Sequence, residues 1–253
     1  MSEASFQNGD RTPNGLLGGL SKGACHVYYA FPEGATDRAA EHMRLLSASE
    51  RARHGRYRFE RDRQLYLVAH ALTRTVLSYY RPVEAQDWRF EPGRHGKPEI
   101  VSPSLGPRLR VNLSHTGGLV ACAVALDDDV GVDVEDSDRE TSILSVAERV
   151  FSDTELRDLH AQTGDGQRHR FFEYWTLKEA YIKADGRGIT LPLRAITFTL
   201  REGLPIQVRF GAGIEDDPTD WRFAQLRPTE RHHLALALRC GTDLSVRSAR
   251  ITP

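Results

Sequence analysis

Residues 171–183 show a hydrophobic pattern with the period of a helix. On a helical wheel at about 100° per residue, one wide apolar arc contains Phe171, Phe172, Tyr174, Trp175, Leu177, Tyr181 and Ile182. Lys178 and Glu179 fall inside this arc, and Lys183 follows one turn after Glu179. Ionised groups at partly buried positions are costly unless they are paired or bound to a metal. These charges therefore require partners from elsewhere in the chain, unless a surface pair between Glu179 and Lys183, worth about 0.2–0.5 kcal/mol, explains them.

The rest of the chain repeats one order of elements twice. The first round has a strand at 26–31, helices at 37–46 and 62–80, and strands at 88–90, 109–113 and 119–126. The second has a strand at 130–135, helices at 142–150, 153–160 and 168–184, and strands at 196–200, 206–210, 221–226 and 233–238. We therefore predict an α+β fold of two pseudo-symmetric halves, each running strand, helices, then antiparallel strands. The predicted boundaries are a flexible leader over 1–22 and halves over 23–127 and 128–253.

Composition narrows the class of protein. A chain of 253 residues with 40% hydrophobic and 27% charged residues is long enough to bury a large core. A net charge of -1 and the lack of a long basic stripe argue against binding to nucleic acid. No apolar run approaches the roughly 20 residues that span a bilayer, so we expect no membrane segment. The three distant cysteines, Cys25, Cys122 and Cys240, are typical of reduced core residues in a cytoplasmic protein.

Two carboxylates share one face of the predicted strand at 130–135. Alternate side chains of a strand point the same way, so Asp133 and Glu135 lie opposite to the valines of this segment. Such carboxylates are roughly 7 Å apart and repel by about 2.4 kcal/mol at an effective dielectric near 20. A hard cation would relieve this repulsion, and oxygen ligands suit Mg²⁺ or Mn²⁺ rather than zinc. A solvated strand face is the alternative for the pair alone, whereas Glu179 as a third carboxylate favours a metal site.

Two further stretches favour recognition of phosphate. Ser114 and His115 stand at the end of a predicted strand before a Thr-Gly-Gly turn, where side chains and backbone N–H groups can converge on an anion. Residues 93–98, Gly-Arg-His-Gly-Lys-Pro, form a basic loop that can lay its backbone against a flat ring while Lys97 points at charge. Taken alone, each stretch is more typical of an ordinary turn or loop.

Six arginines gather between residues 51 and 63, at positions 51, 53, 56, 58, 61 and 63. One interpretation is that they form the solvent-exposed face of a helix. The other is a docking surface for an acidic partner or a polyphosphate, since guanidinium groups bind carboxylates and phosphates well.

Two of these segments together resemble a known family. Gly131-Val-Asp-Val-Glu135 followed by Trp175-Thr-Leu-Lys-Glu-Ala-Tyr-Ile-Lys183 is similar to the paired signature of the 4′-phosphopantetheinyl transferases of the larger Sfp type. Weaker matches extend the resemblance over roughly residues 45–200: the arginine segment, Gly96-Lys97-Pro98, Asn112-Leu-Ser-His115 and the loop after the long helix. The family's two pseudo-symmetric halves, with the active site in the cleft between them, agree with the recurring order of elements.

The resemblance implies a reaction and a set of roles. Such enzymes transfer the 4′-phosphopantetheine arm of coenzyme A to a serine of an acyl or peptidyl carrier protein and release adenosine 3′,5′-bisphosphate. By position, Asp133, Glu135 and Glu179 would hold Mg²⁺, Glu179 would accept the serine proton, and Lys183 would stabilise the leaving pyrophosphate. The residues implied in coenzyme A binding are Arg53, Lys97, Pro98, Ser114, His115, Lys178 and Lys183, with bracing of the helix as the alternative for Lys178.

One position departs from the family. Relatives commonly carry an arginine where this chain has His70, so no phosphate contact is assigned to His70. The three carboxylates follow the pattern, which predicts an active enzyme, and because both halves lie in one chain we expect a monomer. Two alternatives stay open, namely another Mg²⁺-dependent phosphate enzyme, such as a nuclease or nucleotidyltransferase, and a non-catalytic module that docks carrier proteins.

Overall fold

The computed structural model of the protein describes residues 7–8, 19–93 and 96–252. The predicted leader, residues 1–22, lies mostly outside these ranges, as do residues 94–95 of the predicted basic loop. Within the described ranges, no helix combines the length and apolar character needed to cross a bilayer.

The predicted elements recur in two rounds, and the first round contains in addition helix α2 (Ala48–His54) and strand β4 (Pro98–Ser102), which were not predicted. The first round contains β2 (Ala24–Ala30), α1 (Ala39–Leu45), α2 (Ala48–His54), α3 (Glu60–Ser78), β3 (Arg89–Pro92), β4 (Pro98–Ser102), β5 (Leu109–Thr116) and β6 (Leu119–Leu126). The second contains β7 (Asp129–Asp136), α4 (Ile143–Val150), α5 (Asp153–His160), α6 (Gly164–Asp185), β8 (Ile196–Thr199), β9 (Gln207–Phe210), β10 (Trp221–Leu226) and β11 (His232–Arg239). Short 3-10 turns connect several of them: Pro32–Arg38, Ala85–Asp87, Gly188–Thr190, Leu193–Ala195 and Pro218–Asp220.

The two rounds have the same strand topology. In the first, the strands lie in the order β2-β6-β5, and in the second in the order β7-β11-β10, with every neighbouring pair antiparallel. A two-stranded hairpin precedes the last two strands of each round, β3-β4 in one and β8-β9 in the other. The predicted α+β fold of two pseudo-symmetric halves is therefore confirmed.

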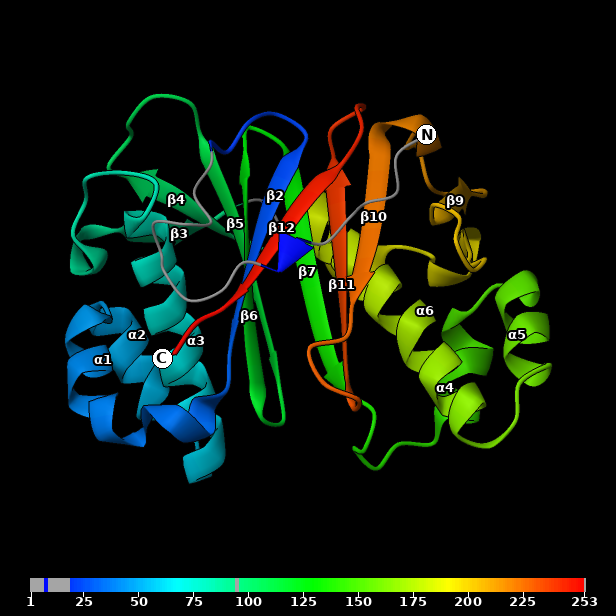
Figure 1. The fold of residues 1–253 in the computed structure, drawn as a ribbon, viewed down its shortest axis with the longest axis horizontal. Helices are drawn as coiled ribbons and strands as arrows, with labels where there is room; N and C mark the ends of the chain where they lie inside the picture. The colour runs from blue at the N-terminus through cyan, green and yellow to red at the C-terminus, as the bar shows by residue number, and fades with distance from the viewer. Residues whose placement is uncertain (1–6, 9–18, 94–95, 253) are drawn as a thin grey trace.

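The two sheets pack face to face between outer layers of helices (Figure 1). Alternate residues of β2 and β6, such as Val27 and Ala123, meet alternate residues of β7 and β11, such as Val132 and Leu236, in one buried cluster. The opposite face of the first sheet packs against α3, and the opposite face of the second packs against α6. The period of two along these strands thus builds a four-layer molecule, helix, sheet, sheet, helix.

The strand β12 (Ser245–Arg250) crosses from the second round to the first. It pairs in parallel with β2 over the full length of β12, and β1 (Gln7–Asn8) pairs in parallel with its other edge. The larger sheet consequently has the order β1-β12-β2-β6-β5. A strand from the range predicted for the C-terminal half thus completes the sheet of the N-terminal half.

Local sequence explains where the helices begin and end. Ser47 and Glu50 form a reciprocal capping box at the start of α2, and Ser152 and Glu155 form another at the start of α5. The helix α6 ends at Gly186, which adopts φ 82°, a left-handed conformation that glycine accepts without cost. The three cysteines are buried free thiols, as predicted.

Candidate active site

The two carboxylates of β7 point toward α6. The valines at 130, 132 and 134 are buried between the sheets, so Asp133 and Glu135 occupy the other face, as the alternation predicts. The helix α6 lies unusually close to this face at Gly131, where an added Cβ would lie 2.0 Å from the carbonyl oxygen of Ala180. Only a residue without a side chain permits this approach, which brings α6 against the strand that carries the carboxylates.

Lys183 of α6 meets Asp133 of β7 at the edge of the second sheet. Its Nζ lies 2.6 Å from Asp133 Oδ1 and 2.8 Å from the hydroxyl oxygen of Ser114 on β5. Ser114 Oγ in turn donates to Asp133 Oδ1 at 3.0 Å. Lys183 therefore pairs with Asp133, and the surface pair with Glu179 that the spacing allowed is not the contact found within the described residues.

Side chains of β5 join the two sheets at this edge. Among the described strands, β7 pairs only with β11. On its other side, Val132 N donates to Asn112 Oδ1 at 2.9 Å and Val134 N donates to Ser114 Oγ at 3.2 Å. Asn112 and Ser114 are two residues apart, so both point toward β7. We call this row of contacts the seam. It brings Ser114 from the N-terminal half to the carboxylates of the C-terminal half.

Glu135 contacts two neighbours, but they do not fully offset its burial and the negative charge of Asp133. Its Oε1 accepts from Trp175 Nε1 at 2.9 Å, and its Oε2 lies 3.3 Å from Arg139. Burial and the nearby charge of Asp133 raise the pKa of Glu135 to about 7, although Arg139 and Trp175 act in the opposite direction. A cation bound nearby would therefore stabilise the ionised form of Glu135.

Glu179 belongs to the same electrostatic group. Burial and the charge of Asp133 raise its pKa, which Lys183 and Arg139 partly offset. Asp133 Oδ2 is buried and has no hydrogen-bond partner among the described residues. An orphaned oxygen and two carboxylates with raised pKa values fit a set of donors for a hard cation. Within the described ranges, however, no group of three or more His, Cys, Asp or Glu is arranged so that it could hold a metal ion, so the metal assignment stays a prediction.

Lys178 does not join these residues. It is fully buried on another face of α6, where its Nζ lies 2.9 Å from Glu155 of α5 and donates to the carbonyl oxygens of Leu193 and Ile196. Glu155 is also fully buried and accepts the backbone N–H of Phe198. The charge that the helical wheel placed inside the apolar arc thus has its own buried partner. This position favours the bracing alternative for Lys178.

Replacing Lys178 with methionine is expected to destabilise the fold by about 3–5 kcal/mol, because it leaves the Glu155 carboxylate buried and unpaired. Urea unfolding followed by circular dichroism measures this loss. The double variant Lys178→Met/Glu155→Gln should lose less than the sum of the single changes, since both charges then disappear together. Lys22→Met, at an exposed lysine, is the matched control. A loss for Lys178→Met no larger than for Lys22→Met would contradict the bracing role.

The predicted phosphate residues of β5 differ in exposure. Ser114 is buried in the seam, whereas His115 is exposed at the next position. Protein atoms still crowd the His115 imidazole, and this loss of hydration lowers its pKa together with the charges of Lys183 and His70. His115 is therefore neutral at pH 7 and lies within electrostatic reach of both helices, α3 through His70 and α6 through Lys183.

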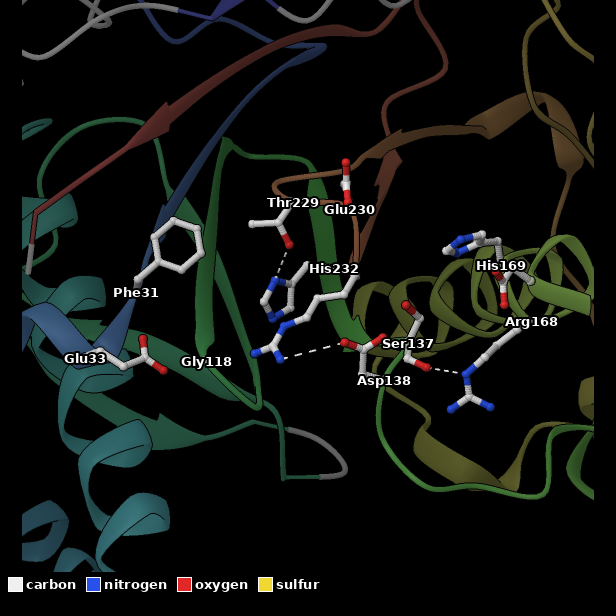
Figure 2. Close-up of a pocket in the computed structure, with 12 residues that line it drawn as sticks. Phe31, Glu33, Gly118, Ser137, Asp138, Arg168, His169, Thr229, Glu230 and His232 are labelled. Carbon is white, nitrogen blue, oxygen red and sulfur yellow. Dashed lines mark hydrogen bonds and ion pairs between the residues drawn. The ribbon is translucent and has the colours of Figure 1, made fainter.

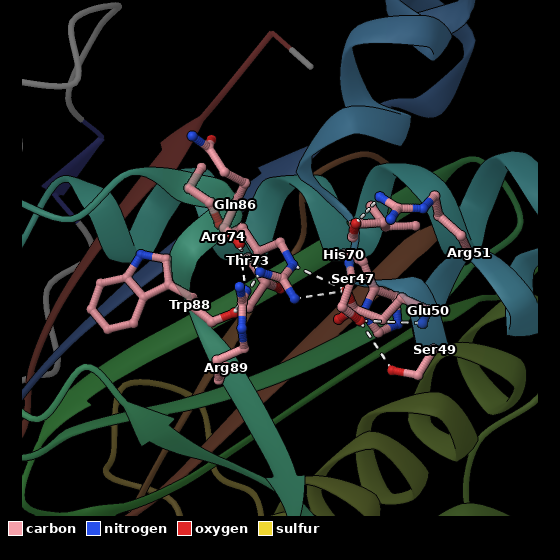
Figure 3. A network of polar contacts seen from close by, with 12 residues as sticks. Ser47, Ser49, Glu50, Arg51, His70, Thr73, Arg74, Gln86, Trp88 and Arg89 are labelled. Atoms are coloured by element: carbon pink, nitrogen blue, oxygen red, sulfur yellow. Dashed lines mark hydrogen bonds and ion pairs between the residues drawn. The ribbon is translucent and has the colours of Figure 1, made fainter.

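A polar network holds α2 against α3 (Figure 3). Glu50 of α2 accepts from Arg74 Nη2 at 2.7 Å and lies 3.2 Å from His70 Nδ1. Burial alone would raise the pKa of Glu50, but hydrogen bonds from His70 and the Ser47 backbone, with the charge of Arg74, lower it to about 2. The exposed Arg53 of the same helix α2 lies over the Tyr66 ring, which contacts the His70 ring at a tilt of 36°. The sequence interpretation missed this network, although Glu50 at the third position of a capping box was a visible signal.

A cavity of about 750 Å³ opens at the carboxyl end of β7. It is lined from the first half by Phe31 and Gly118 and from the second half by Asp138, His169 and Arg231, among others (Figure 2). Its described lining includes none of the predicted site residues. The cavity thus lies next to the carboxylates and not around them.

His232 fixes the turn that forms one wall of this cavity. Its Nε2 donates to the carbonyl oxygen of Gly117 at 2.8 Å. In the neutral ring its Nδ1 then accepts from Thr229 Oγ1 at 2.8 Å, a contact drawn in Figure 2. Because a carbonyl oxygen only accepts, this tautomer follows from the contacts. The β5–β6 turn, two residues after His115, is therefore tied to β11 of the other half.

Comparison with known proteins identifies the family of the chain. Residues 129–237 match the 4′-phosphopantetheinyl transferase superfamily, and residues 35–126 match the 4′-phosphopantetheinyl transferase N-terminal family. These matches define the class: a transferase built from two consecutive regions, with the carboxylates and Lys183 in the second.

Individual relatives extend the likeness. The 4′-phosphopantetheinyl transferase Sfp of Bacillus subtilis is 34% identical over 160 residues, 63% of this chain and 69% of that protein. HetI of Nostoc is 31% identical over 193 residues, 76% of this chain and 78% of that protein. A holo-(acyl-carrier-protein) synthase from Bacillus anthracis, solved in complex with CoA (3′,5′-ADP), aligns with 44% of this chain and 93% of its own, with 18% identity and a TM-score of 0.38. The chain belongs to the 4′-phosphopantetheinyl transferases and is a transferase.

Proposed function

We propose that the protein transfers the 4′-phosphopantetheine arm of coenzyme A to a serine hydroxyl of an acyl or peptidyl carrier protein, converting it from the apo to the holo form. The observation that carries this proposal is the meeting of Asp133, Lys183 and Ser114 between the two halves of a member of this family. In the reaction the serine oxygen bonds to the β-phosphorus of coenzyme A, and the bond from that phosphorus to the bridging oxygen breaks. Adenosine 3′,5′-bisphosphate leaves with the bridging oxygen.

We assign a separate role in this reaction to each residue of the site. Glu179, whose pKa is raised by burial and by Asp133, accepts the serine proton as its oxygen attacks. Lys183 donates to the oxygens of the pyrophosphate that is being cleaved, where charge grows on the leaving phosphate in the transition state. Asp133 holds the Lys183 ammonium in place, and Trp175 and Arg139 hold Glu135.

Asp133, Glu135 and Glu179 would hold a Mg²⁺ ion, with Mn²⁺ as a substitute. The fit rests on the orphaned Asp133 Oδ2 and on the raised pKa values of both glutamates. When bound, such an ion supplies neutralisation of charge on the phosphate oxygens.

For coenzyme A we propose contacts from Arg53, His115 and Ser114 at its phosphates, and from the Lys97-Pro98 backbone at its adenine. Arg53 and His115 are exposed to solvent, whereas Ser114 is buried in the seam and touches Lys183, so it would contact a phosphate beside that ammonium group. Lys178 is assigned to the brace with Glu155. The site draws on both halves of one chain, so we propose that the protein acts as a monomer, and its reduced cysteines support a cytoplasmic location.

Intact-protein mass spectrometry tests the proposal directly. An apo carrier protein incubated with this protein, coenzyme A and Mg²⁺ should gain the mass of one phosphopantetheine group, and EDTA should prevent the gain. A gain that persists with EDTA would refute the metal requirement but keep the transfer. No gain with carrier proteins of the fatty-acid, polyketide and peptide-synthetase types would favour a docking module or another phosphate enzyme.

The arginine segment is expected to govern the affinity for the carrier protein. Arg56, Arg58 and Arg61 are exposed beside the exposed Phe59, so an acidic partner can approach them. Raising the ionic strength from about 0.05 to 0.5 M should increase the KM for the carrier protein, since exposed charges are screened beyond about 10 Å at 0.1 M salt. Arg56→Gln/Arg58→Gln/Arg61→Gln should flatten this salt dependence, while Arg222→Gln, at a distant half-buried arginine, should not. A KM independent of salt would contradict docking at this segment.

A further inference from the structure

The basic loop of the N-terminal half reaches across to the C-terminal half through Lys97. Its Nζ donates to the carbonyl oxygen of Val130 on β7 at 3.0 Å and to that of Ala184 on α6 at 3.1 Å. The backbone carbonyl of Lys97 accepts from Gly93 N at 2.7 Å, which closes the loop behind it. One ammonium group thus joins three segments that are far apart in the sequence.

Both carbonyl groups need a partner from outside their own element. Val130 lies on the edge of β7 that faces β5, the same edge on which Val132 and Val134 donate to side chains of the seam. Ala184 lies in the last turn of α6, where the final carbonyl groups have no partner within the helix. A cation there also interacts favourably with the negative end of the helix dipole. Lys97 therefore extends the seam by one contact and caps α6 at the same time.

The two elements that Lys97 joins carry the reacting groups. Lys183 directly precedes Ala184, and Asp133 lies three residues after Val130. Between these points lies Gly131, which approaches the backbone of α6 at Ala180 and Ala184 and has no side chain to lock the helix in register. Lys97 therefore adds a polar cross-link at the end of α6, beyond the Lys183–Asp133 and Trp175–Glu135 contacts that also join this helix to β7.

We propose that Lys97 is a positioning residue, which fixes the last turn of α6 against β7 so that Lys183 meets Asp133. The inference rests on the proposed function for its effect on rate, since Lys183 is assigned there to the leaving group. It gives the Lys97 ammonium a different task from contact with coenzyme A. Lys97 also links the loop proposed to border the adenine of coenzyme A to the helix α6, which carries Lys183. Binding of the adenine would therefore help to hold Lys183 in place at the pyrophosphate.

The charge of Lys97 sets the conditions for a test. Loss of hydration, together with the charge of Arg110, lowers its pKa to about 8, although Asp129, Glu99 and Asp185 act in the opposite direction. Assays at pH 7 therefore keep the group mostly protonated, so that a substitution removes an ammonium and not a neutral amine.

Steady-state kinetics separate positioning from direct binding. We expect Lys97→Met to lower kcat by about 10-fold to 100-fold, because a small misplacement of a catalytic group has effects of this size, while the KM for coenzyme A changes less than about twofold. Lys97→Arg should restore most of kcat, since guanidinium also donates to two carbonyl oxygens. Lys22→Met is the matched control at an exposed lysine. A raised KM with unchanged kcat would overturn the proposal, because it would make Lys97 a ligand of coenzyme A.

Amide hydrogen exchange provides a readout that needs no carrier protein. Lys97→Met should speed exchange in residues 183–186 relative to the rest of α6, and Lys97→Arg should restore the slow rate. If exchange responds in this way but the wild-type protein modifies no carrier protein, the assigned reaction fails and the cross-link stands. If exchange in residues 183–186 is the same in Lys97→Met and wild type, the positioning role is refuted, whatever the activity.

Discussion

Asp133→Asn is expected to lower the rate of phosphopantetheine transfer by roughly 100-fold to 1,000-fold, the range seen when one electrostatic partner of a transition state is removed. Asparagine keeps the shape of the side chain and an oxygen that can accept from Ser114 and Lys183. It removes the charge that pairs with Lys183 and that the proposed metal ion would require. The rate of mass gain of an apo carrier protein, with coenzyme A and Mg²⁺ in excess, measures the effect.

A second measurement on the same variant separates lost chemistry from lost structure. Asp133 is one cause of the raised pKa of Glu135, so the pKa of Glu135 should fall from about 7 toward its ordinary value in Asp133→Asn. Carboxyl-carbon NMR follows this titration. Asp138→Asn is the matched control, because Asp138 follows the same strand but is exposed and lies 3.9 Å from its partner Arg231. Near-wild-type transfer by Asp133→Asn would remove Asp133 from the proposed mechanism.

The second large effect is expected at Gly131. In Gly131→Ala the new Cβ would lie 2.0 Å from Ala180 O and 2.4 Å from Ala184 N, and both are backbone atoms of a helix. Relief requires α6 to move away from β7, which we expect to cost at least about 3 kcal/mol, the upper end for overpacking. The midpoint of urea unfolding should fall accordingly, and the displaced α6 should also lower transfer by any folded fraction.

A glycine of the same chain offers a control in the opposite direction. Gly166 lies within α6, and a Cβ added there meets its nearest neighbour, Gln162 Oε1, at an ordinary 3.7 Å. Gly166→Ala should therefore stabilise the fold by about 0.5–1 kcal/mol, because alanine loses less backbone entropy in a helix. A Gly131→Ala protein that is as stable as Gly166→Ala would mean that α6 and β7 are not in backbone contact.

Periodicity predicted the elements that bury a regular face. Residues 119–126, 153–160 and 221–226 were predicted with the bounds that β6, α5 and β10 have, and the long helix was placed within a few residues of α6. The recurrence of these elements also indicated the two halves. The carboxylates of β7 and Lys183 of α6 were matched to a family by their residues, and Lys183 and Asp133 do come together.

Other features depend on partners that no local pattern reveals. The helical wheel placed Lys178 and Glu179 in one arc, but Lys178 faces Glu155 of α5, more than twenty residues earlier, while Glu179 belongs with Asp133. Strand β12 and helix α2 were missed. The strand, Ser-Val-Arg-Ser-Ala-Arg, has few apolar residues, and α2 has no buried residue and is fixed by its capping box and by Glu50. Such elements are set by pairing and capping and not by a hydrophobic face.

The position of β12 in the larger sheet constrains how the chain can fold during synthesis. The N-terminal half of a protein commonly folds first as it leaves the ribosome. Here β2 lacks one of its two neighbours until residues 245–250 have been made, because that neighbour is β12. Until then an edge of a central strand stays open, and open strand edges promote association between chains. The N-terminal sheet is therefore completed only at the end of synthesis. We expect residues 23–127, expressed alone, to fold poorly as an isolated domain, because they lack β12.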